Sequence, residues 1–219
     1  MHTLYNFVSG PLAWLAFIVF IGGSIYKIVT MARLAKKKDS AVYEYWDTGF
    51  ALRSIAHWSI PFATVNWRKN PIMTLVTFAF HISLIAVPLF LCAHALLWKE
   101  VFDINWWYIP DGMADVMTLI VIGACFYFAG RRILRPDVKY LTSTSDYLLL
   151  LMVVMPFFTG FWAYHQWPGY RMMFILHMLS GEFVLAAIPF TRLSHMLYAV
   201  FTRGYIGSEF GAVRHAKDW

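Results

Sequence analysis

Charged residues are scarce in this chain: they make up 14% of its 219 residues, whereas a soluble domain carries about 25%. Cysteine is scarcer still, because only Cys92 and Cys125 occur, both inside apolar stretches. Two such cysteines exclude a disulfide framework and a cluster of metal-binding thiolates. The basic residues form no continuous stripe, so the net charge of +6 does not indicate a protein that binds nucleic acid.

Long apolar stretches dominate instead, since 60% of the residues are hydrophobic and 19% are aromatic. A helix needs about 20 mostly apolar residues to cross a bilayer. Five stretches meet this requirement, so the sequence predicts an all-α integral membrane bundle of five transmembrane helices in one domain, 1–219. The predicted spans are 11–29, 71–98, 113–130, 146–164 and 171–201. The connecting loop at 30–70 and the tail at 202–219 complete the chain.

The distribution of lysine and arginine predicts the orientation of these spans. Sixteen of the eighteen lie in three regions: from Lys27 to the end of the 30–70 loop, in the loop after the third span, and at the end of the fifth span and beyond. These positions share one side of the membrane, and Lys99 and Arg171 are the exceptions on the other side. The excess of positive charge predicts that the loop and the C-terminus are cytoplasmic and the N-terminus is outside. The first span precedes its basic cluster, unlike a cleavable signal peptide, so we expect it to be retained.

Four of the eight histidines lie inside predicted spans: His81 and His94 on the second, His177 and His195 on the fifth. An ionisable side chain at membrane depth is costly and usually has a function. If residues 171–203 form one helix, eighteen residues return His195 to the face of His177, about 27 Å further along. The second span runs in the opposite direction. The sequence therefore predicts two pairs, His81 with His195 near the cytoplasm and His94 with His177 near the outside, each suited to bind one haem from both faces.

The second span leaves one question open. Thirteen residues turn an ideal helix by about 220° past whole turns, so His81 and His94 do not share one face. Pro88 lies between them and can kink or rewind the helix. A zinc site is a weaker alternative, because its ligands must converge within a few ångströms. A proton relay is also weaker, because Glu182 is the only carboxylate candidate at mid-depth.

Other residues near the histidines have two interpretations each. Gly160 and Gly181 would let a flat ring approach the backbone, but small residues also serve ordinary helix packing. Arg192 is expected near the inner pair, where it either binds a haem propionate or marks the cytoplasmic boundary. His165, at the outer end of the fourth span, has an interfacial role or takes part in proton release near a quinone.

Three stretches resemble a known family: "FAFHISLIAVPLFLCAH", "GRRILRPDVKYLTSTSDYLLL" and "ILHMLSGEFVLAAIPFTRLSHM". They resemble the gamma subunit of respiratory nitrate reductase, a five-span dihaem cytochrome b that oxidises quinol. The resemblance implies a dihaem cytochrome b domain over 1–219 with two haem b groups. The ligands it implies are His81, His94, His177 and His195, in the two pairs given above. The family's quinol-site lysine has no match here, and Asp111 and Asp115 lie at that place instead.

The long first loop and short tail are similar to those of related cytochrome b subunits, in Tmc- or Hmc-type transmembrane complexes of sulfate-reducing bacteria. This resemblance implies an electron-transfer subunit in the bacterial inner membrane. Its expected partners are membrane lipid, a quinone (menaquinone among the candidates), a cytoplasmic iron–sulfur subunit resembling heterodisulfide reductase, and a periplasmic multihaem cytochrome c. His165, Asp111 and Asp115 are the residues expected at the quinone site. The competing hypothesis is a haem-free membrane anchor or small transporter subunit, for which Pro88, Pro156 and Pro189 are positions where helices could break.

Overall fold

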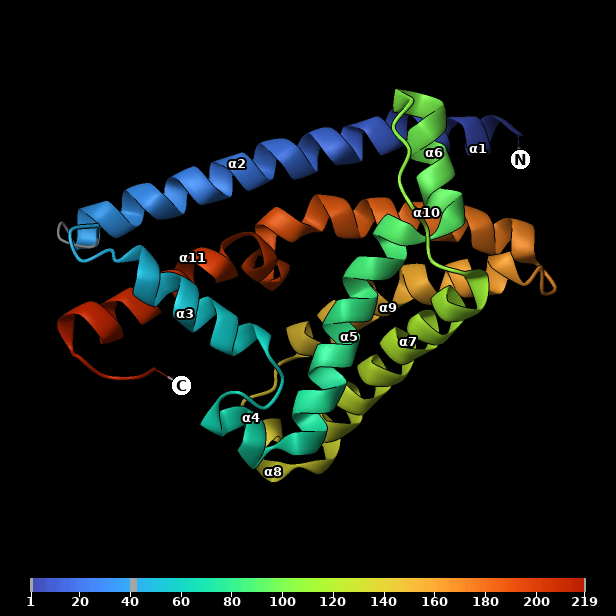
Figure 1. Ribbon diagram of the computed structural model, residues 1–219. Coiled ribbons are helices and arrows are strands. Elements are labelled where there is room, and N and C mark those ends of the chain that lie inside the picture. Colours follow the sequence, from blue (N-terminus) through green and yellow to red (C-terminus); the bar gives the residue numbers. More distant parts are fainter. Residues whose placement is uncertain (1, 40–42, 219) are drawn as a thin grey trace. The chain divides into compact units, whose positions relative to one another are not determined.

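The computed structural model describes residues 2–39 and 43–218, and the regular structure of this part is helical throughout (Figure 1). Contacts divide the chain into two compact units, and each is described by itself. Unit 1 comprises Met1–Thr74 and Glu182–Trp219, and unit 2 comprises Leu75–Gly181.

Five helical segments are long and apolar enough to cross a membrane: His2–Lys38, Pro71–Phe90, Asp111–Leu134, Thr144–Tyr164 and Tyr170–Phe190. The predicted all-α architecture with five spans is therefore confirmed. Large apolar side chains on these segments stay exposed, for example Ile18 at 64% and Phe126 at 71%. Apolar surface of this kind is expected to face lipid. The chain is a multi-pass helical membrane protein.

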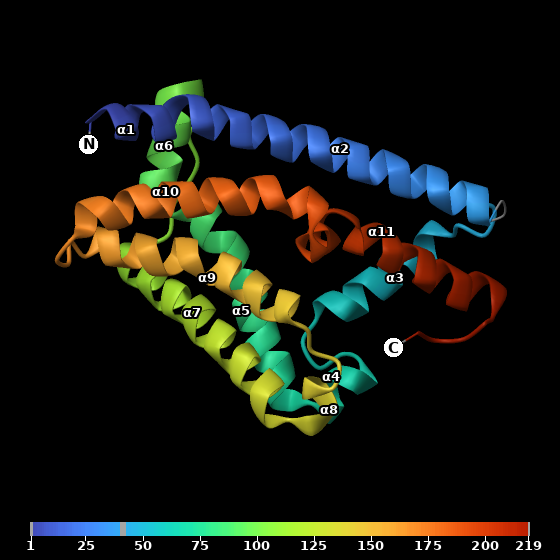
Figure 2. The same ribbon diagram turned by 180° about the vertical axis from the view of Figure 1, so that it is seen from behind.

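Unit 1 begins with a long continuous helical segment and ends with α11, which packs against α3. Its elements are α1 (His2–Phe7), η1 (Val8–Leu12), α2 (Ala13–Lys38), α3 (Thr48–Ser59), α4 (Val65–Lys69), η2 (Ile188–Phe190), η3 (Arg192–Ser194), α11 (His195–Ser208) and η4 (Glu209–Val213). The first span is thus longer than the predicted 11–29. The predicted loop at 30–70 and tail at 202–219 are largely helical, because α3 and α11 pack against each other (Figures 1 and 2).

Glycines on the C-terminal segment allow α3 and α11 to approach closely. A Cβ atom on Gly207 would overlap the side chain of Ser54, and one on Gly211 would overlap the ring of Phe50. Ser54 is fully buried at this contact. Within the predicted tail, Gly204, Gly207, Ser208 and Gly211 are therefore buried.

Arg203 connects α11 to α3 and to the C-terminal segment. Its Nε donates a hydrogen bond of 2.7 Å to Ser54, and its guanidinium lies 4.5 Å from the ring centroid of Trp58. It also pairs with Asp218, whose side chain is 3% exposed. Burial lowers the pKa of Arg203. A buried arginine needs such partners, and these three join α3, α11 and the segment that follows.

Replacing Gly207 with alanine is expected to lower the free energy of unfolding by about 1–3 kcal/mol, because the added methyl group overlaps the Ser54 side chain. Gly22→Ala on α2 is the matched control, since a Cβ there meets no atom within 4 Å. Thermal unfolding of both variants in detergent, followed by circular dichroism, measures the difference. Equal melting temperatures would contradict the close approach of α3 and α11.

Unit 2 contains most of the remaining spans. Its elements are α5 (Pro71–Phe90, from Leu75 onward), α6 (Cys92–Phe102), α7 (Asp111–Leu134), α8 (Pro136–Lys139), α9 (Thr144–Tyr164) and α10 (Tyr170–Ala187, up to Gly181). The short α8 reverses the chain, so that α7 and α9 pack as an antiparallel pair. Buried side chains such as Val121 and Phe157 lie on these two helices.

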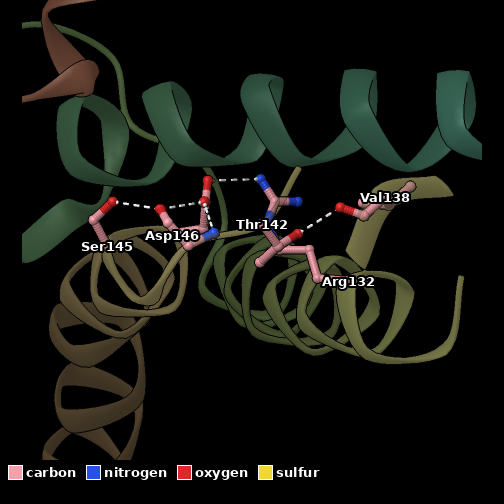
Figure 3. A network of polar contacts seen from close by, with 6 residues as sticks. Arg132, Val138, Thr142, Ser145 and Asp146 are labelled. Carbon is pink, nitrogen blue, oxygen red and sulfur yellow. Dashed lines mark hydrogen bonds and ion pairs between the residues drawn. The ribbon is translucent and has the colours of Figure 1, made fainter. Parts of the chain in front are cut away.

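An ion pair joins α7 to the start of α9 (Figure 3). Asp146 accepts from the backbone N–H of Ser143 at 2.8 Å, and so completes a capping box that begins α9. The same carboxylate lies 3.4 Å from an Nη2 of Arg132 in the last turn of α7. Asp146 is buried, so this pair is less screened than a surface pair. The ion pair thus connects the basic end of α7 to the start of α9.

The structure differs from the sequence prediction at the second and fifth spans. The predicted helix 71–98 is two helices, because Leu91 adopts an extended conformation (φ −67°, ψ 133°) between α5 and α6. The prediction of one continuous helix over 171–201 is wrong. It is interrupted at 188–194, where Pro189 cannot donate a helical hydrogen bond and Thr191 is extended and caps the next turn. The estimate of 27 Å on one face for His177 and His195 therefore does not apply.

Candidate functional site

Two of the four span histidines face each other within unit 2. His94 lies in the first turn of α6, and His177 lies in the middle of α10. Their ring centroids are 5.9 Å apart, and the ring planes differ by 9°. The structure thus brings together the two histidines that the sequence analysis paired near the outside.

Each of these rings is held by a backbone carbonyl. The Nδ1 of His177 lies 2.8 Å from the carbonyl oxygen of Pro156 on α9, and the Nδ1 of His94 lies 3.0 Å from that of Pro88 on α5. A carbonyl accepts only, so each Nδ1 carries the proton and each Nε2 keeps its lone pair. This is the arrangement that orients a metal-binding imidazole and sets its tautomer.

The spacing of the two rings matches that of two imidazoles that would share one metal ion. With an imidazole nitrogen about 2 Å from the metal on either side, the two ring centroids lie about 6 Å apart. The observed separation of 5.9 Å agrees with this value. Among residues 2–39 and 43–218, no group of three or more His, Cys, Asp or Glu side chains could hold a metal ion. A haem needs only two protein ligands, because the porphyrin supplies the other four, so the donor set fits a haem and not a structural zinc ion.

Gly160 makes room for the His177 ring. A Cβ atom on Gly160 would lie 2.7 Å from Nδ1 and 2.8 Å from Cε1 of His177. Gly181, one turn after His177, is different, because a Cβ there meets no atom within 4 Å. Of the two glycines that the sequence analysis noted, only Gly160 is in contact with a candidate ligand.

His81 and His195 belong to different units, so their pairing stays a prediction. Both residues are exposed, whereas His94 and His177 are half-buried, but each has a backbone carbonyl beside its Nδ1. The Nδ1 of His81 lies 2.8 Å from the carbonyl oxygen of Thr77, and the Nδ1 of His195 lies 2.8 Å from that of Arg192. Both rings thus carry the same orienting bond to the backbone. Arg192 contributes its carbonyl to this contact with His195, and the two roles predicted for its side chain, propionate binding or marking the cytoplasmic boundary, stay predictions.

The three residues expected at a quinone site lie at one end of the α7–α9 pair. The Nε2 of His165 lies 3.2 Å from an oxygen of Asp115, and both side chains are 32% exposed. Asp111 interacts with the hydroxyl of Tyr164. Aromatic rings surround His165, with the Phe161 centroid at 4.4 Å and that of Trp167 at 5.9 Å.

A polar contact between α7 and α9 also occurs at the opposite end of these two helices, between Arg132 and Asp146. The His165–Asp115 contact therefore joins the end of α9 to α7. A paired imidazole and carboxylate can also exchange a proton with a bound molecule.

Sequence reasoning missed the residues that orient the histidines. The carbonyls of Pro88 and Pro156 carry no side-chain signal, because every residue has a carbonyl. The role of Trp106 was also missed. With Trp107 and Tyr108 it forms an aromatic cluster typical of a membrane interface, yet its indole Nε1 donates a 2.8 Å hydrogen bond to the carbonyl of Leu89, directly after Pro88. The signal in the sequence that could have located these carbonyls is the presence of Pro88 and Pro156 inside apolar stretches.

Together, the five spans and the facing histidines define the class: a multi-pass helical membrane protein that presents an oriented imidazole pair between α6 and α10. The chain belongs to the same family as a protein of Nitratidesulfovibrio vulgaris strain Hildenborough. The two are 34% identical over 215 residues, which cover 96% of this chain and 95% of the relative. The relative is described only as "Protein", so it contributes no activity. No family model matches the chain. No solved structure matches it.

Proposed function

We propose that this chain is a dihaem cytochrome b subunit, similar to the nitrate reductase gamma family, that carries electrons across a bacterial inner membrane. The observation that carries the proposal is the His94–His177 pair, with near-parallel rings and both Nδ1 atoms bound to carbonyls. A haem b held there would supply one-electron transfer, and two imidazole ligands would leave it no open position for oxygen.

The second haem would be held by His81 and His195. The support is the shared local chemistry, since each ring has its Nδ1 on a backbone carbonyl. The positive charge of the loops supports placing this pair near the cytoplasm and His94 with His177 near the outside, with the N-terminus outside. Two sites at opposite membrane faces would let the protein pass electrons between its two sides.

The visible spectrum of the purified chain tests the proposal. We expect a pyridine haemochrome that gives about two haem b per chain, and a reduced-minus-oxidised difference spectrum typical of low-spin haem. A colourless preparation that remains folded, with helical circular dichroism and a cooperative melting transition, would overturn the proposal. That outcome would favour a haem-free membrane anchor or small transporter subunit.

A quinone, menaquinone among the candidates, is proposed to exchange electrons near the outer pair. His165 lies nine residues after Pro156 on α9, which places it about 13 Å along the helix from the carbonyl that holds His177. His165 is positioned to accept a proton from a quinol hydroxyl, and Asp115 is positioned to stabilise the resulting imidazolium. Asp111, beside Tyr164, would add a second polar group at the same end.

Replacing Asp115 with asparagine, or His165 with glutamine, is expected to lower the rate of quinol oxidation by about 10²–10⁴-fold, the usual contribution of a proton acceptor. Haem content should stay unchanged, because neither residue contacts the histidine pair in the interactions described above. The matched control is Asp103→Asn, which removes a carboxylate from the preceding loop at a left-handed position that asparagine tolerates. Menaquinol-dependent haem reduction by stopped flow measures the effect. A normal rate in both site variants would remove these residues from the proposed quinone site.

The proposed partners are a cytoplasmic iron–sulfur subunit resembling heterodisulfide reductase and a periplasmic multihaem cytochrome c. Their support is the resemblance to Tmc- or Hmc-type complexes, and the relative from Nitratidesulfovibrio vulgaris fits a bacterial source. Affinity purification of the intact complex from its native membrane, with haem staining and iron analysis of the subunits, tests both partners. Recovery of the chain without an iron–sulfur subunit would contradict this part of the proposal.

A further inference from the structure

The break between α5 and α6 leaves three consecutive carbonyls of α5 without their usual helical donors. Because Leu91 is extended, the amides of the next residues no longer point back along α5. Each carbonyl has a substitute donor. Pro88 is bound by the ring of His94 at 3.0 Å, Leu89 by the indole of Trp106 at 2.8 Å, and Phe90 by the backbone of Ile109 at 2.9 Å.

Trp106, from the loop after α6, contacts both sides of the break. Its Nε1 bonds to Leu89 on α5, and its ring lies 5.9 Å from that of Trp98 on α6. Trp98 follows His94 by four residues, one helical turn further on the same helix. The neighbouring Trp107 differs, since it stacks on Phe90 of α5 with centroids 4.4 Å apart and is 66% exposed.

We propose that Trp106 is a positioning residue for the outer histidine pair: by holding Leu89 and packing on Trp98, it sets the direction in which α6 carries His94 toward His177. The bond at Leu89 is adjacent to the bond that His94 makes with Pro88, so a shift at one carbonyl moves the other. The inference deepens the proposed function and rests on it for the identity of the bound group.

The orientation of the two rings has a spectroscopic consequence. The electron paramagnetic resonance spectrum of a low-spin ferric haem depends on the angle between its two imidazole planes, because each plane orients the iron d orbitals. With planes 9° apart, the outer site is expected to give the rhombic signal of nearly parallel ligands. Rotation of His94 would shift that signal, whereas a change in stability alone would not.

The test compares Trp106→Phe with Trp107→Phe in the full-length chain. Both variants keep an aromatic ring and lose one indole N–H, but only the first loses the bond to Leu89. We expect Trp106→Phe to shift the rhombic signal and the reduction potential of the outer haem, and Trp107→Phe to leave both at wild-type values. Trp106→Leu, which carries no hydrogen-bond donor, replaces the phenylalanine variant if the latter does not fold.

A second readout does not depend on haem. Hydrogen–deuterium exchange of the amides in 92–102 is measured in the His177→Ala background. There Trp106→Phe should speed exchange at least several-fold, and Trp107→Phe should not. Unchanged exchange in Trp106→Phe overturns the inference. Faster exchange with an unchanged haem signal reduces Trp106 to a structural role and also overturns it. If the wild-type chain binds no haem, the proposed function fails, and the exchange result alone decides whether Trp106 holds α6.

Discussion

The His177→Ala variant is expected to retain one haem b per chain instead of two, and His94→Ala is expected to lose the same haem. The reason is that the two rings lie 5.9 Å apart and, in the proposed function, would hold one haem together. Without one of the two rings, the remaining histidine would hold a haem more weakly, so we expect this haem to be lost during purification. Haem content by pyridine haemochrome and potentiometric titration of the remaining haem measure the result.

The other predicted pair provides the comparison. His81→Ala and His195→Ala are expected to remove the second haem and to leave the outer one with its native potential. His57→Ala is the matched control, because the His57 ring has the same Nδ1 contact with a carbonyl, 3.0 Å from Arg53, but lies outside the five candidate spans. The control should keep two haems. If His94→Ala and His177→Ala remove haems of different potential, the pairing is wrong.

Gly160→Ala is expected to weaken binding at the outer site although both candidate ligands, His94 and His177, stay in place. A methyl group there would lie 2.7 Å from Nδ1 of His177, so the ring must move and its hydrogen bond to Pro156 is lost. Loss of such an orienting contact typically costs about 10–100-fold in metal affinity. We therefore expect partial loss of the outer haem on purification and a shifted potential for what remains.

Gly181→Ala is the control for this variant, because it lies on α10 one turn from His177 and a Cβ there meets no atom within 4 Å. It should keep the wild-type haem content. Haem retention during dialysis against apomyoglobin, a competing haem acceptor, compares the two variants quantitatively. An equal rate of haem loss for Gly160→Ala and Gly181→Ala would show that the approach of His177 to α9 does not govern binding.

The three span prolines show where sequence reasoning stops. Pro156 lies inside α9, which continues through it, and Pro189 lies in a true interruption between α10 and α11. Pro88 lies inside α5, yet the helix breaks three residues later at Leu91. A proline removes one donor in every case. Whether the helix then breaks depends on donors from elsewhere, and at α5 these come from Trp106 and Ile109 in the following loop.

The amino-acid sequence by itself determined the five membrane-crossing helices and the four candidate ligands, because apolar run length and intramembrane histidine are local properties that need no neighbour. Only the tertiary structure decided that α6 separates from α5, that His94 meets His177, and that Gly160 rather than Gly181 receives the ring. These features arise from hydrogen bonds and contacts between residues far apart in the chain, such as Pro156 with His177, for which neither residue type carries a local signal.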